Sequence, residues 1–115
     1  MKLSLLVSLL LAVGMAVWAQ QAMPKMVTVE PLNGKAGDVI VATGENLQKD
    51  AVAKLFLTDG KNDIGCEMVE QTATTIKFKI PARAPQGARL TLMVLTTGKD
   101  AKYIEQPVKV EIDEQ

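Results

Sequence analysis

The ionisable residues of this 115-residue chain offer few of the arrangements that catalyse reactions. The chain has no histidine, so a Ser-His-Asp triad, a Cys-His pair and histidine-based metal sites are excluded. It also lacks the Gly-x-Ser-x-Gly turn, the P-loop and the dinucleotide-binding fingerprint. Carboxylates can act as acid and base without histidine, but the acidic residues here are scattered over predicted turns and strand faces. We therefore expect no enzyme activity and no cofactor.

The segment Asp59-x-Lys61-x-Asp63 has acidic residues spaced as at the start of a calcium-binding loop. Such a loop needs an oxygen ligand at the position where Lys61 stands. A lysine ammonium cannot donate a lone pair to a cation. We therefore predict a turn here and no metal site.

Cys66 is the single cysteine of the chain. A lone cysteine cannot form an internal disulfide, even in an oxidising compartment. We expect Cys66 to be a small buried apolar residue. The alternative is a reactive or intermolecular thiol, although no histidine is available to lower its pKa.

The elements that position these residues are predicted to be strands throughout. Apolar and polar residues alternate with a period of two, most clearly at 76–80. Turn signals separate the strands about every 10–14 residues, which is typical of an all-β sandwich or barrel. The last strand is interrupted by Pro107, which a strand tolerates at a sheet edge or at a bulge. The predicted strands are residues 26–30, 39–43, 53–58, 64–70, 76–80, 88–97 and 101–112.

Glycine, proline and asparagine punctuate residues 29–47 in a distinctive order. One strand ends at Pro31, a turn carries Gly34 and Gly37, and Gly44 and Asn46 end the next strand. This order of x-Pro, Gly-x-x-Gly, an apolar strand and Gly-x-Asn before a large apolar residue resembles the opening of an IPT/TIG domain. That family has an immunoglobulin-like fold of the E-set type.

A second segment strengthens this resemblance. Residues 74–82 are similar to the strand that closes on Val/Ile-Pro-Ala in the family, and Gly87 follows as it does there. The chain departs from the family pattern at Leu47, where the family usually has Phe, and at Leu57-Thr58, where it often has Phe-Gly. The resemblance covers about residues 26–112 and implies an immunoglobulin-like β-sandwich of about seven strands.

Apolar side chains on the outside of the predicted strands are the candidate binding site. Side chains alternate between the two faces of a strand, so Phe56 points outward if Leu55 and Leu57 point inward. By the same rule, Met93 and Leu95 point outward. The third and sixth strands share a sheet in an immunoglobulin-like sandwich, so these three side chains would form one exposed apolar patch, which often marks a partner site.

The alternative for this patch is that the protein covers it. Loops or the last strand, with Tyr103, would then shield Phe56, Met93 and Leu95 from solvent. In that case the three residues would add to the core and would not bind a partner.

The first residues are predicted to be a secretory signal peptide that precedes the domain. Lys2 is followed by an apolar run from Leu3 to Val13 and by a small-residue cleavage site at 17–19. A membrane anchor needs about 20 apolar residues, and this run ends before Gln20. The predicted organisation is a signal peptide at 1–19, a short leader at 20–25 and a domain at 26–113. We expect a secreted or periplasmic protein with no membrane span after cleavage.

The charge of the mature chain excludes two classes of partner. Without Lys2 it has 12 basic and 13 acidic residues. A nearly neutral chain has no electrostatic footprint for nucleic acid or anionic lipid.

The sequence as a whole predicts a non-enzymatic binding module. The family resemblance implies an interaction role outside the cytoplasm, so we expect a protein partner at an outer sheet face or an exposed edge strand. One alternative is a carbohydrate-binding module, since IPT/TIG domains occur beside polysaccharide-degrading enzymes. It is disfavoured because only Phe56, Phe78 and Tyr103 remain as aromatics outside the signal. Another alternative is a small structural subunit of an envelope complex.

Overall fold

The computed structural model describes residues 23–114, and all regular secondary structure in this range is β-strand. The all-β prediction is confirmed. The predicted signal peptide lies outside the described residues. Within 23–114, no helix is long and apolar enough to cross a membrane. The strands are β1 (Lys25–Glu30), β2 (Asn33–Gly34), β3 (Val39–Glu45), β4 (Val52–Thr58), β5 (Asp63–Gln71), β6 (Thr75–Lys79), β7 (Arg89–Thr96) and β8 (Tyr103–Ile112).

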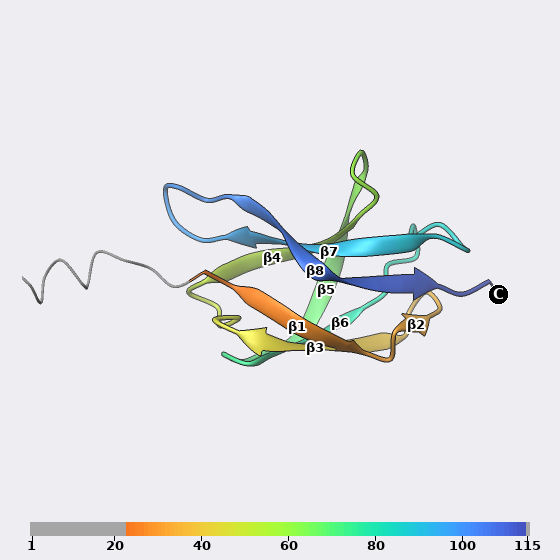
Figure 1. Cartoon of the computed structure of the whole chain (residues 1–115), viewed down its shortest axis with the longest axis horizontal. Coiled ribbons are helices and arrows are strands. Elements are labelled where there is room, and N and C mark those ends of the chain that lie inside the picture. The colour runs from red at the N-terminus through yellow and green to blue at the C-terminus, as the bar shows by residue number, and fades with distance from the viewer. Residues whose placement is uncertain (1–22, 115) are drawn as a thin grey trace, which may run out of the picture.

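The strands form an immunoglobulin-like sandwich of two layers that share β5 (Figure 1). The first half of β5, Asp63–Cys66, pairs with β4, and the second half, Glu67–Gln71, pairs with β6. We call the layer of β1, β3, β6 and the second half of β5 sheet A. The layer of β2, β8, β7, β4 and the first half of β5 is sheet B. All pairs are antiparallel except β2 with β8.

The seven predicted strands are all present, and β2 is an additional short one. The segment predicted as a turn from Gly34 to Gly37 begins with β2, which pairs with the end of β8. The turn itself is confined to residues 35–38, where Gly37 adopts a φ of 91°. Proline at position 107 is accommodated as expected, because the β7–β8 register shifts there and β8 has no strand neighbour on its other side at this point.

Gly44 does not end β3 as the sequence predicted. The strand continues to Glu45, and the next residue, Asn46, breaks it with a left-handed φ of 58°. Gly44 is instead required by the close approach of β1. A Cβ added there would lie 1.9 Å from the main-chain oxygen of Lys25, so no larger residue fits without moving β1.

The core lies between the two sheets and follows the predicted alternation. The inward positions Ile40 and Ala42 on β3 are fully buried, as predicted. Burying this apolar surface contributes roughly 25 cal/mol per Å² and is the main force that holds the two sheets together. The largest fully buried side chains include Phe78, Met26, Ile40, Leu47, Leu55, Leu57, Ile76, Ile80, Leu90 and Leu92.

The side-chain amides of two glutamines form hydrogen bonds with main-chain groups of other segments at the sides of the sandwich. The Oε1 atom of buried Gln106 accepts a 2.7 Å hydrogen bond from the main-chain N–H of Met26, which joins β8 to β1. On the other side, the Nε2 atom of Gln71 donates to the carbonyl oxygens of Leu47 and Val52 at 2.8 and 3.0 Å. Each amide supplies the main-chain partner that no neighbouring strand provides.

Candidate functional site

Four apolar side chains from three strands meet on the outer face of sheet B. Phe56 on β4 lies opposite Met93 on β7, and Leu95 on β7 lies opposite Tyr103 on β8. We call these four residues the apolar patch. The structure therefore brings together the three residues that the sequence proposed and adds Tyr103 to them.

The two aromatic rings of the apolar patch contact each other. The ring centroids of Phe56 and Tyr103 are 5.7 Å apart, and the ring planes are tilted by 58°. Since these residues stand on the strands that flank β7, their rings meet above β7. Such tilted pairs are a favourable geometry for aromatic rings.

The exposure of the patch residues corrects one part of the prediction. Met93 is on the outer face but only 7% exposed, because the aromatic pair from the two neighbouring strands covers it. Phe56 and Leu95 are half-buried, and Tyr103 is 61% exposed. The surface that a partner can touch is therefore formed by Phe56, Leu95 and Tyr103, with Met93 supporting them from below.

Two opposite charges flank the apolar patch. Lys54 on β4 lies opposite Leu95, and Glu105 on β8 lies opposite Met93. Both side chains are exposed. Gly65 on β5 lies opposite Phe56 and is exposed as well.

Cys66 points into the sandwich from β5, one residue after Gly65. It is half-buried and packs against the core. Burial raises the pKa of its thiol to about 12, outweighing a backbone hydrogen bond that lowers it. This is the environment expected of a structural cysteine.

The acidic segment 59–63 is a turn. Oδ1 of Asp59 accepts hydrogen bonds from the main-chain N–H groups of Lys61 and Asn62 at 2.8 and 2.7 Å. These bonds lower the pKa of Asp59. The hydroxyl of Thr58 donates to Oδ1 of Asp63 at 2.7 Å. Within residues 23–114, no three acidic or cysteine side chains are grouped so that they could hold a metal ion.

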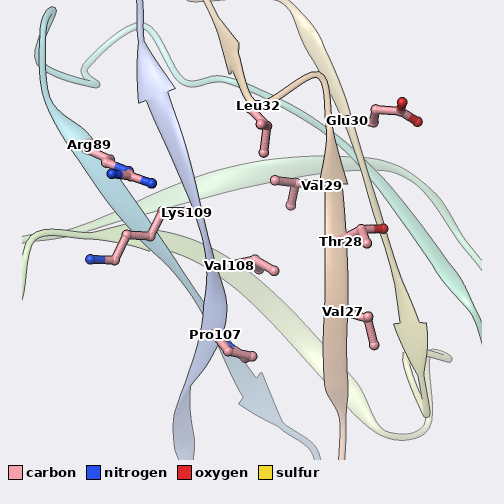
Figure 2. Close-up of a pocket in the computed structure, with 9 residues that line it drawn as sticks. All are labelled: Val27, Thr28, Val29, Glu30, Leu32, Arg89, Pro107, Val108 and Lys109. Atoms are coloured by element: carbon pink, nitrogen blue, oxygen red, sulfur yellow. The ribbon is translucent and has the colours of Figure 1, made fainter.

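A groove between β1 and β8 was not anticipated from the sequence. Figure 2 shows side chains of both strands along it, and its volume is about 740 Å³. Val27 and Leu32 on its rim are 59% and 68% exposed. Val27 stands at a register shift in β1 between Met26 and Thr28, which no local sequence pattern signals.

Both strand edges along this groove carry features that hinder strand addition. Pro107 on β8 has no N–H to offer another strand, and the irregularity in β1 interrupts its hydrogen-bonding edge. The Gln106 amide already occupies the N–H of Met26. The groove is therefore a poor docking edge, despite its apolar rim.

Comparison with known proteins adds information on the fold. No family model and no curated protein matches the chain. Four solved chains match, one of them from a Bacteroides thetaiotaomicron VPI-5482 protein described as a "putative phosphatase". The match has 18% identity and a TM-score of 0.58, and it covers 82% of this chain. It covers only 19% of the Bacteroides chain, so this chain spans about a fifth of that protein's length. At this identity the likeness concerns the fold alone.

Proposed function

We propose that this protein is a secreted or periplasmic, non-enzymatic binding module of the IPT/TIG type that contacts a protein partner through the outer face of sheet B. The observation that carries the proposal is the apolar patch, in which Tyr103 is 61% exposed beside the half-buried Phe56. Large aromatic side chains supply much of the binding energy at protein interfaces. Contiguous exposed apolar side chains often mark a site of protein interaction.

The face is favoured over the strand edges as the contact surface. Pro107 and the irregular β1 obstruct strand addition at the groove. The apolar patch has no such obstruction, and β7 and β4 below it are central, well-paired strands. A rigid platform of this kind loses little entropy when a partner binds.

The experiment is a capture from the envelope fraction with the processed protein as bait, followed by a binding measurement with the purified captured protein. The variant Phe56→Ser, Tyr103→Ser removes the aromatic pair. The control Val27→Ser, Leu32→Ser removes two exposed apolar side chains at the groove. We expect the patch variant to weaken binding at least about tenfold, since interface aromatics contribute 1 kcal/mol or more each, and the control to bind normally.

Equal binding by the wild type and a folded patch variant would refute this use of the face. A glycan ligand is tested with the same variants on a panel of polysaccharides. Saturable binding to a polysaccharide that is lost with Tyr103 would replace the protein partner by the carbohydrate alternative. The 58° tilt between the rings argues against this outcome, since two rings that are not coplanar do not form a flat stacking platform.

The non-enzymatic part of the proposal is tested directly. The Bacteroides neighbour is described as a putative phosphatase, so hydrolysis of an aryl phosphate by the purified protein is the relevant assay. The chain has no histidine, and we expect no release of phosphate above the buffer rate. Release that follows the protein through purification would overturn this part.

A further inference from the structure

We propose that the partner on the outer face of sheet B is a second copy of this chain, so that the protein forms a two-fold symmetric dimer through the apolar patch. This inference rests on the proposed function and gives the partner an identity. It is derived from the arrangement of the apolar patch and of the two charges beside it.

The strand registers place six outward side chains in two rows of three. The central column of this grid is β7, between β4 and β8. One row therefore ends in a negative charge on β8, and the other ends in a positive charge on β4. The rows are Phe56, Met93, Glu105 and Lys54, Leu95, Tyr103.

Residues at diagonally opposite corners of this grid are of the same kind, either aromatic or charged. The aromatic residues Phe56 and Tyr103 occupy one diagonal, and the charged residues Lys54 and Glu105 occupy the other. When two identical surfaces face each other, the two-fold axis lies in the plane between them. An axis along the aromatic diagonal puts each ring against its own counterpart in the other copy.

The same rotation exchanges the two charged corners. Lys54 of one copy then faces the partner's Glu105, and Glu105 faces the partner's Lys54. A single kind of ion pair therefore forms twice across the interface. This arrangement makes the face complementary to itself in both shape and charge.

The two charges have no such partner within one copy. Lys54 and Glu105 stand on β4 and β8, which are separated by β7 and thus by about 10 Å. Among residues 23–114, one ion pair has its charged atoms within 4.0 Å of each other. It joins Lys77 and Glu70 on sheet A. Lys54 and Glu105 are exposed beside the apolar patch and remain free to pair with another molecule.

The test is sedimentation equilibrium of the protein processed from the full chain, from low micromolar to near-millimolar concentration. The patch is small, and small interfaces give weak, reversible association. We expect concentration-dependent dimerisation of the wild type. Lys54→Glu and Glu105→Lys should each raise the dimer dissociation constant about tenfold or more, because each creates two like-charge contacts per dimer.

The decisive variant combines Lys54→Glu with Glu105→Lys. It restores opposite charges at both contacts, so its dissociation constant should return to within about threefold of the wild type. The matched control Lys79→Glu makes the same charge change on the outer face of sheet A and should leave dimerisation unchanged. A wild type that stays monomeric, or a double variant as impaired as the single ones, would overturn the inference.

Failure of this inference can be told apart from failure of the proposed function. If the wild type stays monomeric but binds another protein through Phe56 and Tyr103, the second copy is refuted and the binding module stands. If the wild type neither dimerises nor binds any protein through these residues, both are refuted.

Discussion

The outer faces of the two sheets have the same strand geometry but distribute their side chains differently. On sheet A, Lys77 on β6 lies opposite Glu70 on β5, and their charged atoms are 3.0 Å apart. Lys79 likewise lies opposite Glu67. On sheet B, Phe56, Met93 and Leu95 occupy outward positions of β4 and β7, and the exposed charges of Lys54 and Glu105 stand on strands separated by β7.

The two faces differ in whether their exposed charges are paired within one molecule. Sheet A pairs Lys77 with Glu70 within one molecule, and it also exposes the side chains of Val39 and Val69. Sheet B covers one outward residue, Met93, with its own aromatic side chains and leaves Tyr103 and two unpaired charges facing solvent. The outward positions thus hold an ion pair on sheet A. In our proposal, they form a binding surface on sheet B.

The strongest test of this comparison contrasts the two sides of β7. Leu92 is fully buried between the sheets, whereas Leu95 is half-buried on the outer face. Leu92→Ala should lower the free energy of unfolding by about 2–5 kcal/mol, since it removes buried surface and leaves a cavity. Leu95→Ala should cost less than about 1 kcal/mol and should weaken partner binding instead. Denaturant unfolding measures both, and equal losses would show that the outer face is part of the core.

A second test contrasts the two sides of β5. Cys66 faces the core, with the pKa of its thiol raised to about 12, while Gly65 is exposed on the outer face. At pH 8, Cys66 should react with a thiol reagent at least about 30-fold more slowly than an ordinary cysteine, because little of it is thiolate. The variant Gly65→Cys, Cys66→Ala places the thiol outside and should react at the ordinary rate. Similar rates for both proteins would contradict the inward orientation of Cys66.

The same thiol predicts a dependence of stability on pH. An ordinary thiol loses its proton near pH 9.0, and the Cys66 thiol in the folded protein does so near 12. The unfolded chain therefore binds fewer protons than the folded one above pH 9, so the free energy of unfolding should fall as the pH rises from 9 to 12. Thermal unfolding of the wild type and of Cys66→Ala isolates this effect, which the variant should lack.

The smallest expected effect is on the outer face of sheet A. The Lys77–Glu70 pair is exposed, with 42% and 53% of the side chains accessible. Glu70→Gln should lower the free energy of unfolding by about 0.2–1 kcal/mol, and the loss should shrink in high salt. Glu67→Gln is the matched control, since Glu67 faces Lys79 without a close ion pair. A larger or salt-independent loss from Glu70→Gln would show that sheet A is not simply a solvated face.

The inner faces of the strands could be predicted from the sequence because their pattern is local. Ile76, Phe78 and Ile80 alternate with lysines, and all three are buried. The same alternation placed Phe56 and Met93 on an outer face. It could not show that Met93 is covered, because that depends on how Phe56 and Tyr103 from two other strands register against β7.

Residues outside the apolar alternation were also missed. Gln106 occupies the inward position that precedes Val108 and Val110, and it is buried with them. Its place in this series was a usable signal, because a polar residue in an apolar row is buried only when it has a hydrogen-bond partner. Its partner Met26, however, is 80 residues away. No local sequence pattern predicts that contact or the groove beside it.

The crossing of β5 between the layers links the energetics of the two faces. Cys66 and Glu67 are neighbours in the chain, yet they pair with different sheets. Neither layer can therefore unfold while leaving the other intact, and the domain should melt as a single cooperative unit. Occupation of the apolar patch then shifts the unfolding equilibrium of the whole molecule by mass action. Under our proposal, a partner bound to sheet B would also stabilise sheet A, which it does not touch.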